Sequence, residues 1–94
     1  MQHPRITHRR IRATGRVQGV WYRKSASEEA LRLNLAGTVK NLPDGSVLIH
    51  VQGPAEQVDQ FLHWCRKGPP QAEVANVEME ELPLVEYDGF TIER

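Results

Sequence analysis

The segment between residues 54 and 68 has the apolar spacing that most restricts how this chain can fold. Four apolar residues fall at i, i+3, i+4 and i+7, the pattern of one helix face: Val58, Phe61, Leu62 and Cys65. Gly53–Pro54 precedes them and Gly68–Pro69–Pro70 follows, and both groups interrupt regular structure. A helix with one apolar face needs a second layer to bury that face, so the rest of the chain must supply a sheet or further helices.

A second helical pattern lies nearer the N-terminus, and strand-like alternation surrounds both helices. Tyr22, Ala26, Ala30 and Leu33 recur at helical spacing, with charged and small polar residues between them. Apolar and polar residues alternate in five places: residues 8–14, 38–40, 47–51, about 73–82, and 90–92. The turn residues 42–45 predict that the second and third of these strands form a hairpin.

The predicted order is therefore strand, helix, strand, strand, helix, strand, with a short last strand. It indicates the α+β class and a ferredoxin-like split βαβ sandwich (βαββαβ), in which two helices cover one face of a four- to five-stranded antiparallel sheet. Val74 is out of step with Val77, which predicts a bulge or a late start in the strand at 73–82. We expect one domain at residues 8–94, preceded by a flexible extension at residues 1–7.

Charge and cysteine content argue against several classes of function. The chain has 12 Lys plus Arg and 12 Asp plus Glu, so it lacks the basic field that attracts nucleic acid. Its apolar runs are far shorter than the ~20 residues of a membrane span. Cys65 has no partner for an internal disulfide, and the chain does not open like a secretion signal. We expect a monomeric, cytoplasmic protein that binds neither nucleic acid nor membrane.

The remaining titratable residues do not predict a metal site or a catalytic carboxylate pair. The four histidines show no metal-ligand spacing with Cys65: they are His3, His8, His50 and His63. Cys65 lies on the apolar helix face and is interpreted as a core thiol. Glu78, Glu80 and Glu81 alternate with or flank apolar strand residues, which is typical of a solvated strand face. We therefore expect no metal and no cofactor.

The stretch from Gly15 to Arg23 joins the first strand to the first helix and is a candidate anion site. Its glycines permit unusual backbone angles, and a strand-to-helix turn of this kind can direct backbone N–H groups into a concavity. Glycine spacing alone favours a simple connector, because short glycine motifs occur by chance. Arg23 and Lys24 oppose the helix dipole unless an anion is bound, and Arg grips two phosphate oxygens at once. We interpret Arg23 as an anion ligand and Lys24 as part of a solvated face.

Asn41 precedes the hairpin turn and has two interpretations. Its amide could bond the backbone of the turn, or it could hold a water molecule, since it both donates and accepts hydrogen bonds. The residues alone leave this choice open.

The sequence GRVQGVWYR, residues 15–23, resembles the first signature of the acylphosphatase family. Residues 37–41, GTVKN, followed by Asp44–Gly45–Ser46–Val47 and Gly53, resemble the second signature at the expected separation. The resemblance covers about residues 8–94. Thr38 stands where relatives usually carry an aromatic residue, and Leu48 stands where an acidic residue is common.

The resemblance implies hydrolysis of acyl phosphates to a carboxylate and inorganic phosphate, without a metal or a covalent enzyme intermediate. It assigns the phosphoryl oxygens to Arg23 and to the backbone donors of a phosphate-binding loop that contains Gln18, Gly19, Val20, Trp21 and Tyr22. Asn41 would position the attacking water. The alternative is a non-catalytic ferredoxin-like module that binds an anion or a partner; an RNA-binding domain ranks third, since the chain lacks stacking aromatic residues on the predicted sheet face.

Overall fold

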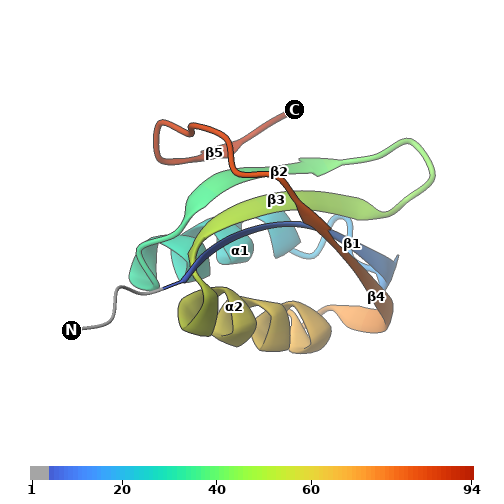
Figure 1. Cartoon of the computed structure of the whole chain (residues 1–94). Helices are drawn as coiled ribbons and strands as arrows, with labels where there is room; N and C mark the ends of the chain where they lie inside the picture. Colours follow the sequence, from blue (N-terminus) through green and yellow to red (C-terminus); the bar gives the residue numbers. More distant parts are fainter. Residues whose placement is uncertain (1–4) are drawn as a thin grey trace.

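The computed structural model describes residues 5–94, in which two helices lie on one face of a five-stranded sheet (Figure 1). The elements are β1 (Ile6–Arg16), α1 (Tyr22–Arg32), β2 (Ala36–Asn41), β3 (Val47–Pro54), α2 (Ala55–Lys67), β4 (Glu73–Leu82) and β5 (Phe90–Ile92). The strand order is β4-β1-β3-β2-β5. The predicted order of strands and helices, and the ferredoxin-like arrangement, are confirmed.

The sheet is mixed, so the prediction of a purely antiparallel sheet is wrong. β5 pairs with β2 in parallel, with Gly37 opposite Phe90 and Val39 opposite Ile92. The chain leaves β4 at one edge of the sheet and crosses the face opposite the helices through residues 83–89, which we call the crossing segment (Figure 1). β4 and β2 run in opposite directions. When the chain turns back at the end of β4 and crosses the sheet, β5 therefore runs in the same direction as β2 and pairs with it in parallel.

The first strand is longer than the sequence pattern predicts. It begins at Ile6 rather than at residue 8, and Ile6 and Thr7 pair with Pro54 and Gly53 of β3. Thr7 is buried and donates its hydroxyl to Glu81 Oε1 at 3.0 Å. The last two residues of the expected extension therefore belong to the sheet, held by backbone pairing that apolar content does not reveal. Residues 1–4 of that extension lie outside the described residues.

The core lies between the sheet and the two helices, and the predicted helix faces are the buried ones. The residues that both helices bury are Tyr22, Ala26, Ala30, Val58, Phe61, Leu62 and Cys65. The central strands β1, β2 and β3 contribute fully buried Ile11, Val39 and Ile49. β4 is an edge strand, and its Met79 is 44% exposed.

The predicted irregularity near Val74 is a bulge. The register of β1 against β4 shifts between Thr14 and Gly15, so that Gly15 faces Val74 while Thr14 faces Asn76. Gly15 has φ 113°, in a region that favours glycine. The bulge ends the regular pairing of β1 just before the loop that leads to α1. None of the helices in the described part of the chain is both long enough and apolar enough to span a membrane.

Candidate active site

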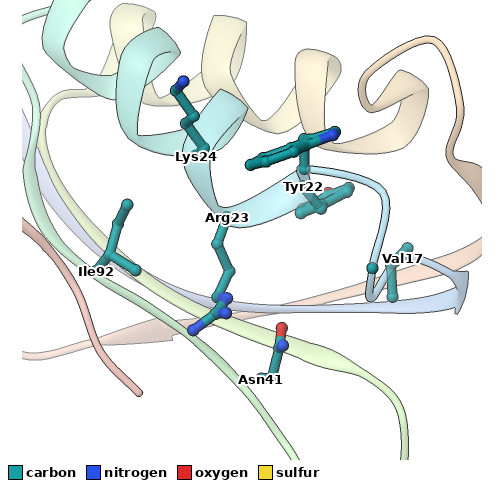
Figure 2. Close-up of a pocket in the computed structure, with 8 residues that line it drawn as sticks. Val17, Tyr22, Arg23, Lys24, Asn41 and Ile92 are labelled. Atoms are coloured by element: carbon teal, nitrogen blue, oxygen red, sulfur yellow. The ribbon is translucent and has the colours of Figure 1, made fainter.

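A pocket of about 300 Å³ lies between the start of α1 and the adjacent ends of β2 and β5. Its lining residues come from four segments of the chain: Val17, Gly19, Trp21, Tyr22, Arg23, Lys24, Asn41 and Ile92. Figure 2 shows the side chains of Arg23, from α1, and Asn41, from β2, reaching toward the same space. The structure thus brings together the two residues that the sequence singles out, although one belongs to the first helix and the other to the hairpin that follows it.

The loop before α1 has an unusual backbone. Gly19 and Trp21 both lie in the left-handed region, with φ 75° and φ 66°. Such a conformation in a non-glycine residue costs on the order of 1–3 kcal/mol and is concentrated at functional sites. Trp21 is the N-cap residue of α1 and its side chain makes no capping hydrogen bond. Within residues 5–94, the first N–H groups of α1 donate no hydrogen bond to the N-cap side chain, and no acidic residue stands in the first turn to balance the helix dipole.

Two cationic side chains, those of Arg23 and Lys24, lie at this end of α1. Arg23 Nη1 donates to the backbone carbonyl oxygen of Glu93 at 2.9 Å, which holds the guanidinium beside the C-terminal strand. The remaining guanidinium N–H groups can still serve a ligand. Within residues 5–94, neither Arg23 nor Lys24 forms an ion pair. An anion in the pocket would supply the missing negative charge to Arg23, Lys24 and the helix start.

Asn41 ends β2 with its side-chain oxygen buried. Asn41 Oδ1 has no hydrogen-bond partner among the described residues. A buried acceptor normally finds a donor, so this oxygen suits a bound donor such as water. The alternative in which the Asn41 side chain bonds the turn is not observed in the described structure, where the turn is closed by its own backbone bonds, Leu42 N to Ser46 O and Gly45 N to Leu42 O.

The predicted phosphate-binding loop divides into residues that line the pocket and residues that support it. Gly19, Trp21 and Tyr22 line the pocket, whereas Gln18 and Val20 do not. Val20 is buried. Gln18 Nε2 donates to the carbonyl oxygens of Leu42 and Ser46 at 2.8 and 2.9 Å. The Gln18 side chain is thus directed toward the hairpin turn and away from the pocket.

Tyr22 also has a structural contact. Its hydroxyl donates to the carbonyl oxygen of Cys65 at 2.8 Å, which links α1 to α2. Burial raises the pKa of the Tyr22 phenol well above its usual value. Tyr22 therefore keeps its proton at neutral pH, and its ring packs against Trp64 in the core.

The hairpin turn beside Asn41 is fixed by charged groups from two other strands. Arg12 donates to Asp44 Oδ2 and to Glu78 Oε1, each at 2.7 Å, and to Ser46 Oγ at 3.2 Å. Asp44 also accepts hydrogen bonds from the hydroxyl and the backbone N–H of Ser46. These Ser46 bonds, followed by the Arg12 contact, hold the pKa of Asp44 well below its usual range. Glu78, which the sequence places on a solvated strand face, is exposed and forms an ion pair with Arg12.

The sequence interpretation missed part of the pocket. Lys24, assigned to the solvated face, lines the pocket, and so does Ile92. Alternation at Phe90 and Ile92 predicts a strand, but it carries no signal that this strand joins the far edge of the sheet beside β2. Only the crossing segment brings Ile92 and the Glu93 carbonyl to the start of α1. Within residues 5–94, no three His, Cys, Asp or Glu side chains are grouped to hold a metal ion.

The fold is that of an α+β protein of the ferredoxin-like class, with a pocket at a strand-to-helix turn whose lining includes Arg23 and Lys24. The family model described as Acylphosphatase matches residues 9–92. The chain therefore belongs to the acylphosphatase family, whose members are hydrolases acting on acid anhydrides.

Individual relatives agree with this assignment. A protein named acylphosphatase from Methylococcus capsulatus is 47% identical over 85 residues, which cover 89% of this chain and 92% of that protein. The structure of an acylphosphatase from Coxiella burnetii is 35% identical, with a TM-score of 0.92 over 99% of this chain and all of that one. Full-length HypF, in its phosphate- and nucleotide-bound form, is 27% identical with a TM-score of 0.87, covering 99% of this chain but 12% of HypF.

Proposed function

We propose that this chain hydrolyses the anhydride bond between the carboxyl and phosphoryl groups of a small acyl phosphate, and that Arg23 and Asn41 carry the reaction. Water oxygen bonds to phosphorus while the bond from phosphorus to the carboxyl oxygen breaks. The electron pair of that bond leaves on the carboxylate, and the products are a carboxylate and inorganic phosphate. Because a carboxylate is a good leaving group, the site mainly has to position the reactants and stabilise charge.

The observation that carries the proposal is the buried, unpartnered Oδ1 of Asn41 beside the free donors of Arg23. A water molecule that donates to Asn41 Oδ1 has its lone pairs free to face the phosphorus atom. Arg23 and the first N–H groups of α1 then hold the phosphoryl oxygens. Charge-assisted hydrogen bonds of this kind strengthen as charge builds on those oxygens.

The proton of the attacking water goes to the substrate. The residues that line the pocket include no His, Asp, Glu or Cys. A phosphoryl oxygen of the substrate itself is close to the water in any in-line attack and takes up the proton. No general base of the protein is required in this scheme.

The direct test follows the loss of benzoyl phosphate by absorbance, with the purified chain in excess chelator. We expect turnover well above the rate in buffer, and the same rate without chelator. A chain that binds phosphate but gives no turnover would be the alternative, a binding module. The similarity to HypF is the reason to test this alternative, because the matching segment there is 12% of a larger protein. Turnover that disappears with chelator would contradict a metal-free reaction.

Two variants separate the proposed roles. Arg23→Gln should lower kcat by about 10²–10³-fold, the scale for losing an electrostatic donor from a preorganised site. Asn41→Ala should lower kcat far more than it weakens inhibition by inorganic phosphate, because its target is the water. Weaker phosphate inhibition at unchanged kcat would contradict the role of Asn41. Far-ultraviolet circular dichroism must show native folding for both variants.

We also propose that the chain works as a single copy in the cytoplasm. Its one cysteine, Cys65, is a free and fully buried thiol. Such a thiol suits a reducing compartment. Sedimentation of the purified chain at micromolar concentration tests the monomer, for which a mass near 10.7 kDa is expected.

A further inference from the structure

The pocket has an apolar side that the chemistry at phosphorus does not use. Trp21 is 70% exposed and Ile92 is 41% exposed, and both line the pocket. Ligand pockets typically combine apolar and aromatic side chains with a few polar groups that orient the ligand, and these two residues supply the apolar part here. Arg23, Lys24 and Asn41 supply charged and amide groups to the same pocket.

Trp21 occupies a position that disfavours it in two ways. Its φ of 66° lies in the left-handed region, which favours glycine or asparagine. Its side chain also has no oxygen that could cap α1. Its ring is also largely in water. Neither packing in the core nor capping of α1 explains a tryptophan at this position. Its place in the pocket lining is the remaining structural explanation.

The indole ring is flanked by a cation. Lys24 Nζ lies 5.7 Å from the centroid of the Trp21 ring, within the range of a cation–π contact. This contact restrains the ring at the mouth of the pocket. A restrained aromatic ring loses little freedom when a ligand packs against it, which favours binding.

The size of the pocket agrees with a ligand larger than phosphate. Its volume of about 300 Å³ is at the lower end of the range of small-molecule sites, so it leaves room beside a phosphoryl group held by Arg23. Ile92 reaches the pocket from β5, and Trp21 reaches it from the loop before α1. An acyl group attached to the phosphoryl group would therefore have apolar side chains from both elements to contact.

We propose that Trp21 and Ile92 form a subsite for the acyl group, which makes the chain selective for acyl phosphates with an aromatic or bulky apolar acyl group over acetyl phosphate. The inference rests on the proposed function and names its substrate class. Packing of an aromatic acyl group against the indole ring should favour that substrate by about three- to tenfold.

The test compares kcat/KM for benzoyl phosphate and acetyl phosphate, each divided by its spontaneous hydrolysis rate. Trp21→Ala should lower the benzoyl-to-acetyl ratio about three- to tenfold, so that the value for benzoyl phosphate falls by more than the value for acetyl phosphate. Trp21→Phe should restore most of the ratio, and Trp21→Gly, which suits the left-handed backbone, should behave like Trp21→Ala. Leu84→Ala removes a 59% exposed side chain outside the pocket and should change nothing.

Two outcomes would overturn the subsite: an unchanged ratio in Trp21→Ala and Trp21→Gly, or an equal fall for both substrates, which would mean that Trp21 only supports the loop. Calorimetric titration with benzylphosphonate and methylphosphonate reads the same selectivity without turnover. If the unaltered chain binds benzylphosphonate more tightly in a Trp21-dependent way but hydrolyses neither acyl phosphate, the proposed function fails and the subsite stands. If turnover occurs and neither readout depends on Trp21, the subsite alone fails.

Discussion

Gln18 Nε2 lies 2.8 Å from the carbonyl oxygen of Leu42, and this bond joins the loop before α1 to the turn after β2. Leu42 directly follows Asn41, while Gln18 lies in the loop that leads to Arg23. The bond therefore restrains the separation of Arg23 and Asn41, the residues that we propose hold the phosphoryl group and the water. Gln18 does not itself line the pocket, so we treat it as a positioning residue.

Gln18→Ala should lower kcat by about 10–10²-fold, because small displacements of reacting groups are costly when catalysis depends on position. The free energy of unfolding should fall by only about 0.5–1.5 kcal/mol, since both carbonyl oxygens keep a backbone donor. Steady-state kinetics and urea unfolding measure the two effects.

Gln52→Ala is the matched control for this prediction. Gln52 exchanges two hydrogen bonds with the backbone of Val85 in the crossing segment, away from the pocket. It should lose comparable stability and keep its activity. Equal losses of kcat in both variants would mean that Gln18 acts through general stability rather than position.

The carboxyl group of Asp44 should titrate well below its ordinary value of 3.8, because Ser46 and Arg12 stabilise its charged form. A group whose pKa is lowered by folding adds stability above its unfolded pKa, and this contribution is lost progressively as the pH falls from that value through the lowered pKa of the folded state. Titration of the Asp44 carboxyl carbon by nuclear magnetic resonance measures the midpoint directly. Arg12→Ala should raise that midpoint, and an unchanged midpoint would contradict the assigned contact.

The fold could be predicted largely from the sequence because its elements are short and have clear periodicity. The apolar faces of α1 and α2, the hairpin at Asp44–Gly45 and the irregularity at Val74 are all local patterns, and local geometry decides them. The mixed sheet could not be predicted, because the pairing of β5 with β2 depends on the path of the crossing segment over the far face. That path is held by long-range contacts, such as His8 Nε2 with the Tyr87 hydroxyl at 2.7 Å.

The sequence predicts that Arg23, Asn41 and Trp21 belong to one site, and all three line the pocket, whereas Lys24 and Ile92 line it without having been predicted. Arg23 and Asn41 could be found because their chemistry stands out from their surroundings and because the two signatures resemble a family. Gln18 was assigned to the loop, but its partners on the turn are 24 and 28 residues away and no spacing rule connects them. Ile92 and the strained backbone of Trp21 gave no sequence signal, since both depend on how β5 and the loop are placed.

Cys65 should resist thiol reagents in the native chain. Burial raises the pKa of Cys65 to about 12, so very little thiolate is present at pH 8. With a disulfide reagent such as 5,5′-dithiobis(2-nitrobenzoate), labelling should be slow and should follow the rate of unfolding, and in urea it should reach one thiol per chain. Complete labelling of the native chain within seconds would contradict a buried, protonated thiol.

Replacing Gly37, the glycine of β2, with alanine should strongly destabilise the fold. Gly45 in the hairpin turn provides the matched control. Both have a positive φ, 144° and 94°, so both variants to alanine carry backbone strain. A Cβ atom at Gly37 would also collide with the carbonyl oxygen of His50 on β3, whereas a Cβ at Gly45 meets no atom within 4 Å.

Gly37→Ala should therefore lose more than ~2 kcal/mol beyond the loss in Gly45→Ala, measured by urea unfolding. The collision falls on backbone atoms, so it can be relieved only by moving β2 away from β3. Because β2 carries Asn41 at its end and pairs with β5 at Gly37, that movement should also lower kcat in the fraction that remains folded. Equal stability of the two variants would contradict the predicted collision between a Cβ atom at position 37 and β3.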